Sequence, residues 1–183
     1  MYVEAPAWIV IIGLVFALAI IAGWGISESV WLAAVITVVE VGGLLFVIVI
    51  ATQIETPQAL QINDLVPSLD SSVWLGVALG AFLAFYAYIG FEDMVNVAEE
   101  VIHPRRTLPL GILTALVIST LLYIFVAIAA IYAVPVDQLS VSNAPLVDIV
   151  KQYSQSAVVV MGIISMIAVV NGALIQIIIC LLY

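Results

Sequence analysis

The chain has 183 residues, of which 66% are hydrophobic and only 8% carry a charged side chain. Soluble domains are about half apolar and about a quarter charged, so this composition excludes a water-soluble enzyme and a disordered chain. It predicts a protein whose surroundings are the lipid bilayer. Three basic against twelve acidic residues give a net charge of -9, which excludes nucleic acid as a partner. The single cysteine, Cys180, has no second cysteine for a disulfide within the chain.

Five apolar runs of the sequence predict transmembrane helices, which need about 20 predominantly apolar residues. The runs are continuously apolar rather than alternating, so they favour an all-α membrane protein over a β-barrel. We expect a single membrane domain over residues 1–183 with spans at residues 7–24, 30–52, 73–91, 108–134 and 157–183. The last run reaches the final residue, so we expect the chain to be a fragment of a longer protein.

Basic residues predict the orientation of these spans, because lysine and arginine close to span ends mark the cytoplasmic face. Arg105 and Arg106 stand immediately before the fourth predicted span, and Lys151 lies on the opposite side. The pair outweighs the single lysine, so we expect the loop around Pro104 to be cytoplasmic.

Glu40 lies in the middle of the second predicted span, where a charged group costs about 2.5–3.5 kcal/mol. One interpretation is a protonated carboxyl group that is hydrogen-bonded to a neighbouring helix. The other is a proton carrier or a cation ligand, and the residues leave both open. Asn171 and Gln176 in the last span have two interpretations as well, namely hydrogen bonds between helices or contact with a substrate or ion.

Glu92 and Asp93 follow the third apolar run, and two structures are compatible with them. If the helix ends at Phe91, both acids lie among the lipid headgroups. If the element instead continues to Ile102, it is about 45 Å long and has to be broken near Gly90, where glycine makes a break inexpensive. The acid pair then suits the first turn of a second half-helix. Broken membrane helices matter because their freed backbone groups bind small zwitterions and ions.

Enzymatic chemistry has no residues to support it. The sequence lacks the GxSxG nucleophile motif and the HExxH zinc motif. Glu100 and His103 have the spacing of a di-iron ligand pair, but the chain has no second histidine to complete such a site. We therefore predict no enzyme activity, no cofactor and no metal.

Three segments in order resemble the amino acid permeases of the amino acid–polyamine–organocation superfamily, most of all prokaryotic relatives of cationic amino-acid transporters. Residues 85–93, 98–100 and 104–112 resemble the sixth span of that family and the loop after it. Residues 25–29 are similar to the loop between its fourth and fifth spans, residues 40–44 to its fifth span, and residues 171–176 to its eighth. The resemblance implies spans four to eight of a transporter with about twelve spans, built from two inverted five-span repeats with a broken sixth span.

The resemblance also implies roles for individual residues. It places substrate binding at the break, which comprises Tyr86, Ala87, Tyr88, Ile89 and Gly90. Backbone carbonyls there would hold the α-ammonium group of the substrate, and Gly90 would give it access. Gating or contact with the substrate side chain falls on Phe85 and Phe91. A cytoplasmic gate of ion pairs falls on Glu99, Glu100, Arg105 and Arg106.

Coupling to an ion is expected at Glu40, with Glu92 and Asp93 as further members of a proton relay. Related permeases carry a lysine at the position of Glu40, where it takes the place of a bound sodium ion. An acid at this position departs from that pattern and favours protons as the coupling ion.

We therefore expect a plasma-membrane protein that moves amino acids or related amines by alternating access, as a proton-coupled symporter or an exchanger. Its partners are the substrate, protons, lipid and the missing spans of the same permease or a partner chain. The alternative is a self-contained five-span subunit with a structural or assembly role in a membrane complex.

Overall fold

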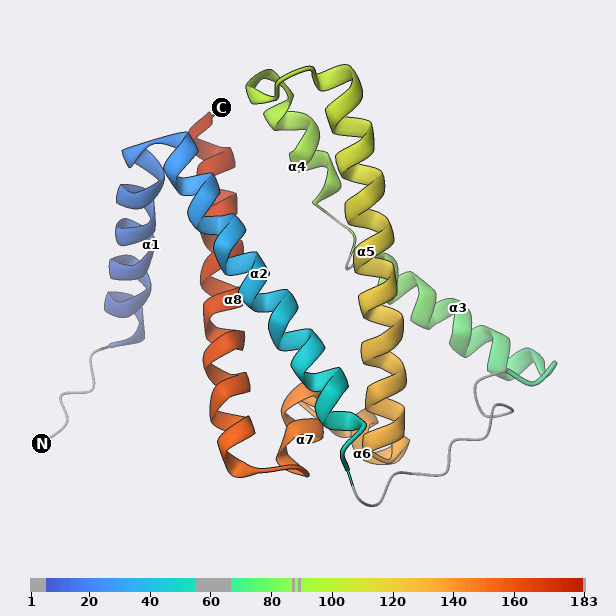
Figure 1. The fold of residues 1–183 in the computed structure, drawn as a ribbon. Coiled ribbons are helices and arrows are strands. Elements are labelled where there is room, and N and C mark those ends of the chain that lie inside the picture. Colours follow the sequence, from blue (N-terminus) through green and yellow to red (C-terminus); the bar gives the residue numbers. More distant parts are fainter. Residues whose placement is uncertain (1–5, 55–66, 87, 89, 183) are drawn as a thin grey trace, which may run out of the picture. The chain divides into compact units, whose positions relative to one another are not determined.

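The computed structural model describes residues 6–54, 67–86, 88 and 90–182, and all regular elements in these ranges are helical. The all-α prediction is therefore confirmed for the described residues. Figure 1 shows the elements, which are α1 (Ala7–Trp24), α2 (Ile26–Ala51), α3 (Ser71–Tyr86), α4 (Phe91–Asn96), the 3₁₀ turn η2 (Val97–Glu100), α5 (Pro104–Ala133), α6 (Val136–Val141), α7 (Pro145–Lys151) and α8 (Gln155–Leu182).

Three segments of the described chain are long and apolar enough to cross a membrane, namely Ser27–Ala51, Pro104–Ala133 and Gln155–Leu181. Helices α1 and α3 are also apolar, but with 18 and 16 residues they fall short of the usual span of about 20. These helices indicate a membrane protein. Five complete spans and an inverted repeat remain predictions.

The chain divides into two compact units, the first formed by Met1–Leu44 and Val158–Tyr183. In this unit α1, most of α2 and most of α8 pack around a small apolar core of Leu18, Ala22, Ala33, Leu174 and Ile178. Only Gly25 separates α1 from α2, so the two helices turn back on one another (Figure 1). The buried hydroxyl of Ser29 secures this corner through hydrogen bonds to the carbonyl oxygens of Ile21 and Gly25, both at 2.8 Å.

Gly43→Ala is expected to lower the free energy of unfolding by about 1–3 kcal/mol, because it overpacks the contact between α2 and α8. A Cβ at Gly43 would lie 2.7 Å from Cγ2 and 3.2 Å from Cδ1 of Ile164, and a β-branched side chain in a helix has little freedom to move away. Thermal unfolding of the detergent-purified protein, followed by circular dichroism, measures the effect. Gly42→Ala is the control, since a Cβ there meets nothing within 4 Å. Equal stability of the two variants would contradict the contact.

The second unit comprises Leu45–Ala157. Its buried side chains gather at the C-terminal ends of α2 and α5 and on α7, where Val47, Val134, Ile149 and Val150 are at most 2% exposed. Helix α5 packs against α7 at one end and against α4 and η2 at the other. Helix α3, by contrast, has no buried residue. This unit therefore offers an apolar helix whose faces lie open.

The third predicted element differs from the structure in two ways. Helix α3 ends at Tyr86 rather than at Phe91, and the half-helix after the interruption does not reach Ile102. Helix α4 ends at Asn96 and tightens into η2, after which Val101 is extended and His103 is left-handed with φ 56°. Pro104 accounts for the last of these features, because a proline disfavours the right-handed helical region for the residue before it.

Two other helices begin earlier than expected. Helix α2 begins at Ile26 instead of residue 30, and α5 begins at Pro104 instead of residue 108. The first turn of α5 is fixed by local hydrogen bonds: the amides of Arg106 and Thr107 donate to the carbonyl of His103 at 3.0 and 3.1 Å. The length of an apolar run predicts which part of a helix lies in lipid, whereas the hydrogen bonds of the first turn determine the residue at which the helix begins.

Candidate functional site

The interruption between α3 and α4 lies where the resemblance placed a broken helix. Helix α3 closes with a hydrogen bond from the amide of Tyr88 to the carbonyl of Phe85 at 3.0 Å, and α4 begins again at Phe91. Between them Gly90 adopts φ 119°, a conformation that glycine reaches easily and other residues rarely adopt. Tyr88 and Gly90, the described residues between the two helices, are therefore not helical.

The predicted substrate-binding residues are distributed around this interruption. Ala87 and Ile89 lie outside the described residues. Tyr86, at the end of α3, is 71% exposed and Phe85 is 69% exposed, so both rings are available for contact. The backbone of Phe91, Glu92 and Asp93 forms the first turn of α4. Their roles in gating and coupling remain predictions.

Tyr88 connects the interruption to the middle of α5. Its hydroxyl shares a hydrogen bond of 2.8 Å with Oγ1 of Thr120, and its ring meets that of Tyr123 edge-on, with 5.5 Å between ring centroids and 75° between planes. Sequence analysis did not single out this contact. The sequence feature that could have indicated it is the spacing of Thr120 and Tyr123, which lie three residues apart and therefore on one face of α5.

Glu40 and Asn171 meet within the first unit. Asn171 is only 2% exposed, and its Nδ2 donates to Oε1 of Glu40 at 2.9 Å and to Oγ1 of Thr37 at 3.2 Å. Thr37 in turn donates to the carbonyl of Ala33 at 3.0 Å. Asn171 thus makes the interhelical hydrogen bond that was one of its two interpretations. Thr37 was missed, although its position three residues before Glu40 puts both on one face of α2.

One acceptor in this cluster has no donor. Oδ1 of Asn171 is buried and has no hydrogen-bond partner in the part of the chain that the structure describes. An unsatisfied buried acceptor costs about 1–3 kcal/mol. The bond from Nδ2 of Asn171 meanwhile holds one oxygen of the Glu40 carboxyl group beside α8.

Gln176 does not join the cluster. It is exposed, and α8 turns by about 100° per residue, so five residues after Asn171 its side chain lies on a different face of the helix. Its predicted contact with a substrate or ion remains untested. Within the described residues no three acids, histidines or cysteines gather to hold a metal ion.

The residues of the predicted cytoplasmic gate lie on both sides of one turn. Glu99 and Glu100 belong to η2, Arg105 and Arg106 to the first turn of α5, and all four are exposed. In the described part of the chain no ion pair joins either glutamate to either arginine. The gate therefore stays a prediction.

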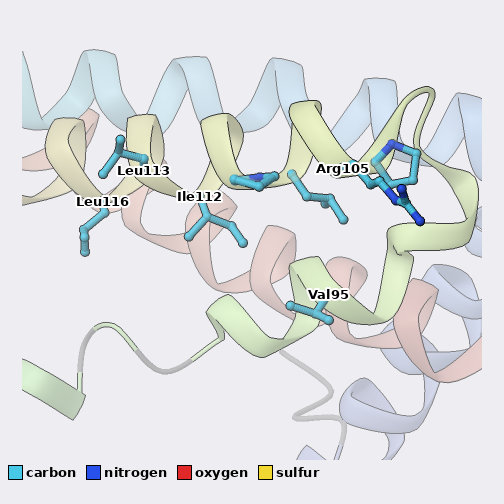
Figure 2. A pocket seen from close by; sticks show the side chains of 8 residues that line it. Val95, Arg105, Ile112, Leu113 and Leu116 are labelled. Carbon is cyan, nitrogen blue, oxygen red and sulfur yellow. The ribbon is translucent and has the colours of Figure 1, made fainter.

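An open apolar pocket of about 710 Å³ lies between α4 and the first half of α5. Figure 2 shows Val95 of α4 on one side and Ile112, Leu113 and Leu116 of α5 on the other, with Arg105 at one end. Its walls are almost entirely apolar carbon, so it provides space rather than polar recognition.

Known proteins resemble the chain over most of its length. A family profile described as amino acid permease matches residues 2–181. The vacuolar cationic amino acid transporter 4 of Arabidopsis thaliana is 34% identical over 122 residues, which are 67% of this chain and 20% of the relative. The methylthioribose transporter of Bacillus subtilis (strain 168) is 38% identical over 96 residues, or 52% of this chain and 20% of the relative. An uncharacterized transporter of Mycobacterium tuberculosis is 34% identical over 144 residues, or 78% of this chain and 31% of the relative.

The matched part of the chain thus spans about a fifth to a third of these relatives. No solved structure matches it. The relatives are named as transporters, which agrees with the apolar helices and with the prediction that no enzyme is involved. A match over residues 2–181 covers nearly the whole chain, and so the chain belongs to the amino acid permease family of the amino acid–polyamine–organocation superfamily.

Proposed function

We propose that the protein containing this chain transports amino acids or related amines across the plasma membrane by alternating access, with the loop around Pro104 on the cytoplasmic side. The observation that carries the proposal is the interruption between Tyr86 and Phe91, in a chain of the permease family. Helix ends at membrane depth offer free carbonyl and amide groups to a small zwitterion. The alternative, a structural subunit, is not favoured by the family match.

In this proposal the substrate's ammonium group binds the backbone around Tyr86, Ala87 and Ile89, while Gly90 leaves room for it and Tyr88 lines the site. Phe85 and Phe91 contact the rest of the substrate or close over it. The names of two relatives support different substrates, one a cationic amino acid and the other methylthioribose. An amino acid is the choice that the family description favours.

Coupling is assigned to Glu40, with Glu92 and Asp93 as further carriers of the proton. The support is that Asn171 holds one carboxyl oxygen of Glu40 while the side chain remains partly exposed, so the other oxygen is open to exchange with a neighbour. Symport with protons and exchange of substrates both fit this arrangement. The gate is assigned to Glu99 and Glu100 together with Arg105 and Arg106, whose ion pairs would form in one state of the cycle.

Uptake by the full-length permease in proteoliposomes tests the function. The probes are labelled arginine, leucine and methylthioribose. We expect saturable uptake of at least one of the two amino acids, and a higher accumulated amount when the outside is acidified. Empty liposomes are the control. Uptake of methylthioribose alone would contradict the proposed substrate class. No uptake of any probe, by protein that is folded and inserted, would favour the structural subunit.

A further inference from the structure

We propose that Thr120 and Tyr123 of α5 are positioning residues, which hold Tyr88 and thereby fix the shape of the interrupted backbone for substrate. The inference rests on the proposed function, because it assigns the interruption to substrate binding. It adds two residues that lie 32 and more positions away in the sequence and on a different helix. Neither residue touches the substrate in this proposal.

The contact fixes both the position and the orientation of Tyr88. The hydrogen bond to Thr120 locates the hydroxyl at 2.8 Å, and the edge-on contact with Tyr123 sets the plane of the ring. Such aromatic contacts prefer ring centroids about 4.5–7 Å apart, and the observed 5.5 Å lies within that range. Both partners come from one face of α5, which is 30 residues long and continuous. Tyr88 is therefore anchored to a continuous element rather than to a loop.

The interruption benefits from such an anchor because glycine allows its backbone more than one conformation. The helical hydrogen-bond ladder stops at Tyr86, and Gly90 has a conformation that glycine can also leave easily. Helix α4 has only six residues, too few to be stable by itself. A contact that holds Tyr88 in place beforehand spares the substrate the cost of ordering that residue.

Another contact between α4 and α5 is apolar. Cε of Met94 lies 4.0 Å from the position that a Cβ would take at Gly111, which is ordinary van der Waals contact. The open apolar pocket beside Val95 lies along the same two helices (Figure 2). The hydrogen bond between Tyr88 and Thr120 adds a polar, directional contact to these apolar ones.

Thr120→Val tests the anchor, because valine keeps the volume of threonine and removes the hydroxyl. In the full-length permease we expect KM for the transported substrate to rise about fivefold, the equivalent of about 1 kcal/mol, while kcat changes by less than about twofold. Thr120→Ser, which restores a hydroxyl, should recover the wild-type KM. The double variant Tyr88→Phe with Thr120→Val should be no weaker than Tyr88→Phe alone, because both remove the same bond.

Thr114→Val is the matched control. Thr114 is on the same helix, and its hydroxyl donates only to the carbonyl of Leu110 one turn earlier, at 2.7 Å. Its KM should equal that of the wild type. Equal KM values for the Thr114 and Thr120 variants, or a loss of kcat without a change in KM, would overturn the inference.

Amide hydrogen exchange tests the anchor even if the proposed function fails. In Thr120→Val the amides of residues 88–96 should exchange about fivefold faster than in the wild type, and in Thr114→Val they should not. If the wild type transports none of the probes, the proposed function is contradicted. If Thr120→Val leaves amide exchange at residues 88–96 unchanged, the inference about Tyr88 is contradicted. The two failures are therefore distinct.

Discussion

Gly90→Val is expected to abolish measurable substrate binding, the largest effect of any single substitution proposed for this protein. Gly90 adopts φ 119° where α3 gives way to α4. Side chains with a Cβ pay about 1–3 kcal/mol in such backbone regions, and a β-branched residue pays most, because its branches crowd the adjoining peptide groups. The valine variant would escape the penalty by reshaping residues 87–90, which removes the arrangement that we propose for the substrate.

Isothermal calorimetry on the full-length permease measures this loss. Gly90→Ala should weaken binding about tenfold, since alanine carries a smaller penalty, and Gly90→Val should leave no detectable heat. Gly80→Ala is the control, because Gly80 lies within α3 and a Cβ there meets no atom within 4 Å. A dissociation constant that survives in Gly90→Val would argue that the interruption is not the substrate site.

Glu40→Gln is expected to remove the effect of a pH gradient on uptake while leaving substrate binding largely intact. Glutamine keeps the size of glutamate and an oxygen that can accept from Nδ2 of Asn171, so the contact between α2 and α8 survives. It cannot take up or release a proton. We therefore expect accumulation driven by an acidic outside to fall about tenfold or more, with substrate exchange at equal pH changed by less than about threefold.

The other acid of α2 provides the control for this experiment. Glu28 lies in the first turn of the helix and is exposed, so Glu28→Gln removes the same charge far from the cluster around Asn171. Uptake into proteoliposomes, with and without a pH gradient, gives both quantities for each variant. If Glu40→Gln responds to the gradient as the wild type does, Glu40 is not the proton carrier.

The long helices could be predicted from the sequence because apolar length alone determines them. Helix α1 lies over the predicted residues 7–24, and α8 differs from residues 157–183 by a few positions at most. Helix starts were less predictable. The four extra residues of α5 depend on hydrogen bonds from the amides of Arg106 and Thr107 to the carbonyl of His103, and hydropathy carries no information about such bonds. The interruption at Gly90 was one of two structures that the residues allowed, and the family resemblance was needed to choose it.

Side-chain partners could not be predicted, because they depend on how distant helices pack. The polar character of Glu40 and Asn171 was evident from the sequence, but they are 131 positions apart and nothing in the pattern joined them. Thr37, Thr120 and Tyr123 are ordinary residues for a membrane helix until a partner is placed beside them. The ion pairs expected between η2 and α5 stay a prediction, because nearness in sequence alone does not determine whether those side chains meet.

The corner at Gly25 has a consequence for how the protein is made. With a single residue between α1 and α2, the connection is too short for one helix to settle in lipid while the other waits in water. The hydroxyl of Ser29 in α2 also bonds to the carbonyl of Ile21 in the last turn of α1 and to that of Gly25 at the corner, which ties the two helices together. Because the two helices are joined so closely, we expect them to enter the bilayer together as one hairpin.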